Sequence, residues 1–168
     1  MSKVVMIIAQ NNFRDEELLD TKAVLEKGGA KVKVAAPELR KALGKLGAEV
    51  VPDMTIKQIK LNDFDAVVFV GGSGSADYFD NEQVINLAKD FYETKKLVAA
   101  ICIAPSILAN AGILKGIRAT AFPSEEHNLR LKGAEYSGNV VEVSGNIITG
   151  RGPEAAIEFG QRILQALK

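Results

Sequence analysis

The apolar residues of the chain gather in short uninterrupted runs, and three of these runs are typical of strands buried on both faces. The runs cover residues 4–9, 65–72 and 97–101, and Val, Ile and Ala dominate them. A short apolar run without polar alternation favours a strand that is covered on both sides, as strands of a parallel sheet are. These runs are therefore predicted to form the centre of a sheet.

The other strand candidates are less uniform in composition. Residues 31–36 alternate between polar and apolar, and residues 40–54, with two Gly and a Pro, predict short strands and turns. Residues 117–122 predict one more strand. Residues 140–150 predict a hairpin that turns at residues 144–146.

Segments between these strands have the apolar spacing and the boundary residues of helices. Residues 14–29 begin with acidic side chains, which suit a helix N-terminus, and end on a glycine pair. Asp80 and Gln83 predict a capping box for a second helix. Its apolar face is predicted to contain Val84, Leu87, Ala88 and Phe91.

Two further helices are predicted toward the end of the chain. Residues 104–112 form the first, which Gly112 would end. Pro153 suits the first position of the closing helix. The face of that helix is predicted to contain Ile157, Gly160, Leu164 and Leu167.

Strands that alternate with helices imply a mostly parallel sheet with helices on both faces, here in one domain over residues 1–168. Ligands bind such sheets at the carboxyl ends of the strands, where the strand order reverses. The segments that directly follow the buried strands are 11–17, 71–75 and 102–105. They supply carboxylates, a glycine pair and a thiol.

The charge and hydropathy of the chain argue against two classes of binding partner, nucleic acids and membranes. Lys and Arg number 21, as do Asp and Glu, so no net charge attracts nucleic acid or an anionic membrane. No apolar run approaches the roughly 18 residues of a membrane helix. We therefore expect a cytosolic protein without nucleic-acid or membrane partners. One Cys and one His cannot form an internal disulfide or a four-ligand Cys/His zinc site, and no metal or cofactor is expected.

Phosphate binding is not favoured by the loops at the strand ends. Residues 10–17 contain no glycine and are acidic, whereas a dinucleotide site needs glycines there for close backbone approach. Residues 72–77, GSGSAD, lack the Lys-Ser/Thr of a phosphate-binding loop. A tight turn explains this segment better.

Cys102 can be interpreted as an inert buried residue or as a nucleophile. A lone cysteine is more often the former. Its place between a buried strand and a helix favours the latter, because N–H groups at a helix N-terminus stabilise a thiolate. The N–H groups of Ile103 and Gly72 would form an oxyanion hole, and Gly71 with Gly72 would let that loop approach closely.

Polar neighbours of the thiol are harder to assign. Asp15 and Glu16 are explained as favourable charges at a helix N-terminus, but one carboxyl in residues 15–17 could face inward. Beside a thiolate it should be a protonated acid with a raised pKa. His127 is the only imidazole and is expected at the surface, and the Ser106 hydroxyl is expected to bond backbone.

Four segments together resemble one known family. They are residues 13–20, 65–75, 97–116 and 148–153, which match in order over nearly the whole chain. The sequence A-I-C-x-x-P and the Gly-Gly loop resemble the ThiJ/PfpI superfamily, which includes intracellular peptidases and protein deglycases. The resemblance implies a flavodoxin-like three-layer sandwich of the class I glutamine amidotransferase type, usually assembled as homodimers or hexamers.

The resemblance also implies roles for individual residues. Cys102 matches the nucleophile, and Glu17 matches a protonated carboxylate that hydrogen-bonds the thiol. Gly72 and Ile103 match the backbone donors of the oxyanion pocket. The segment 150–153, which contains Arg151, matches a stretch near the site.

Departures from the family pattern affect the expected reaction. The peptidases have a histidine base directly after the cysteine, where this chain has Ile103. The deglycases use a histidine where this chain has Phe122, and His127 matches neither position. Near the loop where the peptidases borrow an acidic residue from a neighbouring subunit, this chain offers Asp77. A proteolytic triad is therefore not expected.

The leading hypothesis is a cysteine-nucleophile enzyme for small reactive carbonyls such as glyoxals, or a thiol that peroxide oxidises, with a low-pKa thiolate in both cases. An intracellular cysteine peptidase and a non-enzymatic redox-sensing or chaperone-like module are the alternatives. The pocket is predicted to involve Arg14, Gly71, Phe122 and Arg151. Arg14 would make it more cationic and favour anionic substrates.

Overall fold

The computed structural model describes every residue from Met1 to Lys168 and has a seven-stranded sheet at its centre. The strand order is β11-β12-β8-β7-β1-β3-β6, and all neighbours are parallel except β11 with β12. In this order, the strands span Val141–Ser144, Ile147–Gly150, Leu97–Ile101, Ala66–Phe69, Lys3–Ile7, Lys31–Ala36 and Met54–Thr55. The prediction of a mostly parallel α/β sheet is confirmed.

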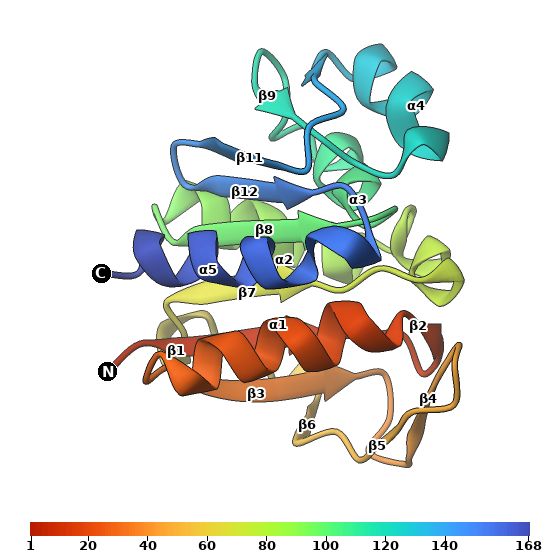
Figure 1. Cartoon of the computed structure of the whole chain (residues 1–168), viewed down its shortest axis with the longest axis vertical. Coiled ribbons are helices and arrows are strands. Elements are labelled where there is room, and N and C mark those ends of the chain that lie inside the picture. The colour runs from red at the N-terminus through yellow and green to blue at the C-terminus, as the bar shows by residue number, and fades with distance from the viewer.

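Helices cover both faces of this sheet. In Figure 1, α1 (Asp15–Lys27) and α5 (Ala156–Ala166) lie on the near face, with α2 (Glu82–Glu93) and α3 (Pro105–Asn110) behind it. The remaining helix, α4 (Glu126–Leu131), lies beyond the β11 edge. Side chains alternate between two cores: Val5 and Ile7 of β1 belong to one, and Val4 and Met6 to the other. Both faces of the central strands are therefore buried.

Shorter elements extend the loops at the sheet ends. A three-stranded sheet joins β2 (Asn11–Phe13), β4 (Ala42–Gly44) and β5 (Glu49–Val50), and a two-stranded sheet joins β9 (Arg118–Ala119) and β10 (Glu135–Tyr136). The 3₁₀ helices span Ile56–Gln58, Leu61–Asp63, Ser73–Tyr78, Pro123–Glu125 and Pro153–Ala155. No helix is both long enough and apolar enough to cross a membrane.

Three details of the sequence prediction are wrong. The strand predicted at 117–122 is only Arg118–Ala119 and pairs outside the main sheet. The cap of α2 is Asn81, whose side chain accepts a hydrogen bond from Val84, so Asp80 lies one residue too early. Ile157 is exposed, because α5 buries the adjacent stripe instead. That stripe contains Ala156, Phe159, Gly160 and Ile163.

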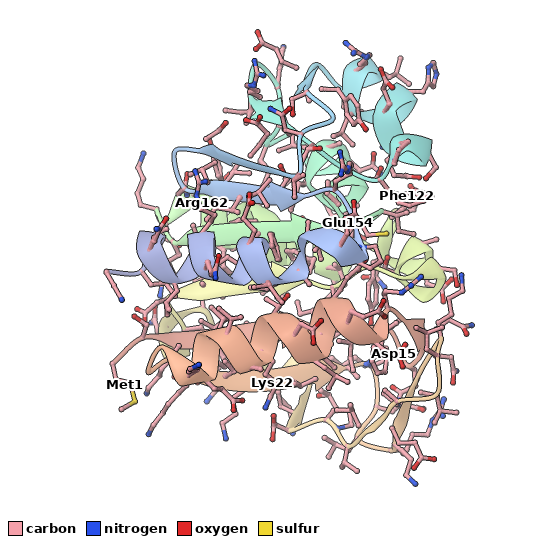
Figure 2. The ribbon with its side chains drawn as sticks, in the orientation of Figure 1. Met1, Asp15, Lys22, Phe122, Glu154 and Arg162 are labelled. Atoms are coloured by element: carbon pink, nitrogen blue, oxygen red, sulfur yellow. The ribbon has the colours of Figure 1, made fainter.

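Parallel strands bring the loops at their carboxyl ends to one edge of the sheet. β1, β7, β8 and β12 all end at the edge toward which their arrows point in Figure 1. Asp15, Phe122 and Glu154 lie at this edge in Figure 2, although they are far apart in the sequence. The segments predicted to meet at the strand ends therefore do so.

Candidate functional site

Cys102 occupies the turn between β8 and α3 in a conformation that few non-glycine residues adopt. Its φ of 65° lies in the left-handed region, which is unfavourable for an L-residue by about 1–2 kcal/mol. The Cys102 N–H donates to the Gly150 carbonyl at 2.9 Å, and the Phe122 N–H donates to the Cys102 carbonyl at 2.8 Å. The strained turn is thus held by β12 and by the segment that follows β9.

The backbone N–H groups of Gly72 and Ile103 favour the thiolate form of Cys102, and both act to lower the pKa of the thiol. Gly72 has a φ of 100°, and a Cβ there would lie 2.4 Å from both the Arg14 nitrogen and the Asn12 carbonyl oxygen. A side chain at this position would push the N–H away from the sulfur. The structure therefore gathers both predicted backbone donors around Cys102.

Glu17, in the first turn of α1, is fully buried beside the thiol. Its Oε1 accepts a hydrogen bond from the Gly71 N–H at 2.9 Å, whereas its Oε2 has no hydrogen-bond partner. Burial raises the pKa of the Glu17 carboxyl to about 8, because it outweighs the Cys102 thiol and the Gly71 N–H, which both act to lower that pKa. At neutral pH the group is therefore a carboxylic acid, and its proton belongs on Oε2.

The Cys102 thiol also holds its proton more strongly than a free cysteine does. Burial, followed by repulsion from an ionised Glu17, raises the pKa of the Cys102 thiol to about 12. The expectation of a lowered thiol pKa is therefore wrong, because the two N–H groups do not outweigh burial. Repulsion from Glu17 acts only when that carboxyl is ionised. The protonated form of Glu17 is therefore the partner that permits a thiolate.

Gly71 separates the acid from the thiol. A Cβ at this position would lie 2.5 Å from Glu17 Oε1, 2.6 Å from Cys102 Cβ and 2.7 Å from the Ile101 carbonyl oxygen. These distances are far below van der Waals contact. The contact between Glu17 and Cys102 therefore depends on the absence of a side chain at Gly71.

Cys102 lines a pocket of about 380 Å³ at the carboxyl ends of the strands. Two of the predicted pocket residues, Arg14 and Phe122, line it as well, whereas Gly71 and Glu17 do not. The whole lining comprises Arg14, Lys45, Gly72, Ser73, Ala76, Phe79, Cys102, Ile103, Phe122, Ser124, Glu125 and Pro153.

The charged residues before Glu17 have separate structural roles. Arg14 forms a bidentate ion pair with Glu16 at 3.0 and 3.1 Å, and this hydrogen bonding lowers the pKa of the Glu16 carboxyl. The Asp15 carboxylate accepts from the N–H groups of Leu46 and Ala48 at 2.9 and 2.8 Å. Asp15 therefore fixes the turn between β4 and β5, which places Lys45 at the pocket, in addition to any helix-terminal effect.

Several residues considered from the sequence lie away from the thiol. Arg151 donates to Glu154 and to the Gly138 carbonyl at 2.9 and 3.1 Å and does not line the pocket. His127 is exposed on α4, as expected, and Asp77 lines a different hollow. The predicted role of Arg151 in the pocket is therefore wrong.

Lys45, Phe79 and Glu125 are among the lining residues that the sequence did not indicate. All three lie on turns or 3₁₀ segments rather than directly after a buried strand. Ser106, whose hydroxyl was expected to bond backbone, instead donates to Glu125 Oε1 at 2.7 Å. Pro, Ser and Gly residues near these positions predict that the chain turns there. They do not predict which part of the molecule the turn faces.

Known proteins are similar to this chain in sequence. An uncharacterized protein of Methanocaldococcus jannaschii is 42% identical over 170 residues, which cover 99% of this chain and 83% of the relative. A Pyrococcus horikoshii protein named deglycase is 30% identical, over 98% of this chain and 99% of the relative.

Similarity extends to solved structures. The crystal structure of a ThiJ/PfpI domain protein from Brachyspira murdochii has a TM-score of 0.96 and 35% identity, covering 98% of this chain and 95% of the other. The model of the DJ-1/PfpI family matches residues 2–166. The chain therefore belongs to the DJ-1/PfpI family.

Proposed function

We propose that this protein is a cytosolic, cysteine-dependent enzyme that acts on small reactive carbonyls such as glyoxals, in the manner of glyoxalases or deglycases. One observation carries the proposal: Cys102 lies between a buried acid, Glu17, and the pocket, with two backbone N–H groups at its sulfur. The deglycase name of the Pyrococcus horikoshii relative supports the same class of substrate.

The proposed nucleophile is the Cys102 thiolate. The reactive species is the minor form in which the thiol has lost its proton while Glu17 keeps its own, so that the acid can donate a hydrogen bond to sulfur. Attack on an aldehyde carbon creates an oxyanion next to the sulfur, where the Gly72 and Ile103 N–H groups lie. The site thus stabilises charge first on sulfur and then on oxygen.

Pocket size favours a small substrate over a peptide. A volume of about 380 Å³ is near the lower end of the range for ligand pockets, roughly 300–1,000 Å³. The chain's only imidazole, His127, does not line the pocket, so the thiol has no histidine base from this chain. Both observations support carbonyl chemistry rather than peptide hydrolysis.

Turnover of methylglyoxal to lactate tests the proposal. The wild-type protein is expected to consume methylglyoxal, and Cys102→Ser is expected to lose this activity. His127→Ala, on an exposed position away from the pocket, should retain it. Absence of turnover by the wild type, or full activity of Cys102→Ser, would show that the thiol does not perform this reaction.

Substrate charge provides a second test. The Glu16 carboxylate neutralises the charge of Arg14 in an ion pair. Lys45 also lines the pocket, and its ammonium group forms no ion pair. We expect the anionic 2-oxoaldehyde 4,5-dioxopentanoate to have a lower KM than methylglyoxal. Lys45→Gln should raise the KM of the anion roughly 5- to 10-fold, as loss of an exposed charge contact of about 1 kcal/mol implies. Equal effects on both substrates would contradict this role for Lys45.

A further inference from the structure

The proposed reaction needs a proton acceptor that can reach the substrate, and the pocket contains a single candidate. Of the lining residues, four have titratable side chains: Arg14, Lys45, Cys102 and Glu125. Arg14 and Lys45 are cations, and Cys102 is the proposed nucleophile. Glu17 is buried and does not line the pocket. Glu125 therefore remains as the one base that can touch a bound molecule.

Hydrogen bonds hold the Glu125 carboxylate in one orientation. The Ser106 hydroxyl donates to Oε1 at 2.7 Å, and the Ser124 hydroxyl donates to Oε2 at 2.8 Å. Ser106 is fully buried and accepts in turn from Asn128 at 3.2 Å. A carboxylate has about four acceptor positions, so lone pairs remain for a substrate.

Ser106, one of the two serines that orient Glu125, is itself held by a network of hydrogen bonds. Asn128 also donates to Asn110 Oδ1 at 3.1 Å, and Asn110 donates to the Phe79 carbonyl at 2.9 Å. The chain of hydrogen bonds thus runs from α4 through α3 to the segment before α2, and Phe79 belongs to the same pocket wall. Such a network fixes a functional group better than an exposed loop does.

We propose that Glu125 is the acid–base catalyst that moves a proton between the two carbonyl carbons of a 2-oxoaldehyde bound to Cys102. This inference rests on the proposed function and assigns the group that replaces the absent histidine. Ser106 and Ser124 are positioning residues, because they act on the substrate only through Glu125.

The proposed steps balance without an added oxidant. Cys102 sulfur bonds to the aldehyde carbon C1, and the oxygen on C1 takes a proton to give a hemithioacetal. Glu125 removes the hydrogen of C1, the electron pair forms a C1=C2 bond, and the oxygen on C2 takes the proton of the C1 hydroxyl. Glu125 then returns its proton to C2 while C1=O re-forms. C1 is oxidised and C2 reduced, which leaves a thioester.

Water completes the cycle. It attacks C1 of the thioester, the carbon–sulfur bond breaks, and the thiolate leaves as the 2-hydroxy acid forms. Glu125 can accept the proton of the attacking water, since it lies on the pocket side of the thiol. The sum of the steps is 2-oxoaldehyde plus water to 2-hydroxy acid.

Glu125→Gln tests the assignment against a neighbouring control, Glu126→Gln. Glu126 pairs with Arg130 at 2.8 Å and does not line the pocket, so this variant should retain wild-type turnover. Glu125→Gln should lower kcat for methylglyoxal about 100-fold or more, the usual effect of losing a general base. Alkylation of Cys102 by iodoacetamide should keep its wild-type rate, because the nucleophile remains intact.

An isotope effect separates catalysis from a structural role. With methylglyoxal deuterated at C1, Glu125→Gln should show a larger primary isotope effect than the wild type, because loss of the base slows removal of the C1 hydrogen. Ser106→Ala should show the same change to a smaller extent. Two results would overturn the assignment of Glu125 but not the proposed function. One is equal turnover by Glu125→Gln and Glu126→Gln, and the other is slow turnover by Glu125→Gln with an unchanged isotope effect. Lack of turnover by the wild type would overturn the proposed function together with that assignment.

Discussion

Glu17→Gln is expected to stabilise the protein at neutral and alkaline pH while leaving its stability in acid nearly unchanged. Burial raises the pKa of the Glu17 carboxyl from 4.5 to about 8. The folded state therefore binds its proton more strongly than the unfolded state, and stability falls as pH rises from 4.5 through 8. At about 1.4 kcal/mol per pH unit, the loss amounts to roughly 5 kcal/mol.

Glutamine mimics the protonated acid and cannot ionise. Its oxygen can accept from the Gly71 N–H, and its amide can donate toward the Cys102 sulfur, as the neutral carboxyl would. The substitution therefore keeps the contacts of the acid form and removes the penalty of burying a charge.

Urea unfolding of both proteins from pH 4 to pH 9 measures the effect. The difference in unfolding free energy should be close to zero at the acid end and should grow across the window from pH 4.5 to 8. Glu16→Gln is the matched control, since ion pairing lowers the pKa of that carboxyl and its contribution is lost only in acid. Parallel stability curves for Glu17→Gln and the wild type would show that Glu17 is ionised in the folded state.

Gly71→Ala is expected to destabilise the protein and to abolish the reactivity of the thiol. The new methyl group would lie within 2.7 Å of three atoms, which belong to Glu17, Cys102 and the backbone of Ile101. The two side chains are buried and the third atom is backbone, so no flexible group can move aside. Overpacking of this kind costs about 1–3 kcal/mol.

Unfolding and alkylation by iodoacetamide should be measured on the same Gly71→Ala sample. Gly112→Ala serves as the control: its φ of 79° strains an alanine, but no atom lies within 4 Å of the new methyl group. That variant should lose stability by about 1 kcal/mol and keep its alkylation rate. If Gly71→Ala reacts with iodoacetamide as fast as Gly112→Ala does, the glycine does not set the spacing of acid and thiol.

The local pattern of apolar and polar residues was sufficient to predict the central sheet and the residues around the Cys102 sulfur. The apolar runs that became β1, β7 and β8 are buried on both faces, so continuous hydrophobicity is their signature. Cys102 and Gly72 directly follow such strands, and parallel strands end at one edge. Their proximity therefore follows from topology alone, whereas Glu17 needed the family resemblance to separate it from Asp15 and Glu16.

The far side of the pocket could not be predicted in the same way. Lys45 reaches it because Asp15 holds the turn between β4 and β5, and Glu125 reaches it through Ser106. Both placements depend on side-chain contacts between segments distant in sequence. Ile157 shows the same limit within one helix, since two adjacent stripes of α5 fit the helical spacing and only packing decides which of them is buried.

The left-handed turn at Cys102 makes residue 102 informative about relatives whose chemistry has changed. Glycine adopts that φ without the steric penalty that any side chain meets. Glycine at this position would relieve the strain of the folded state, so stability favours glycine there. Use of the thiol in a reaction opposes that substitution. A family member that has abandoned cysteine chemistry should carry glycine here more often than serine or alanine, so one letter of the sequence records whether the reaction is still under selection.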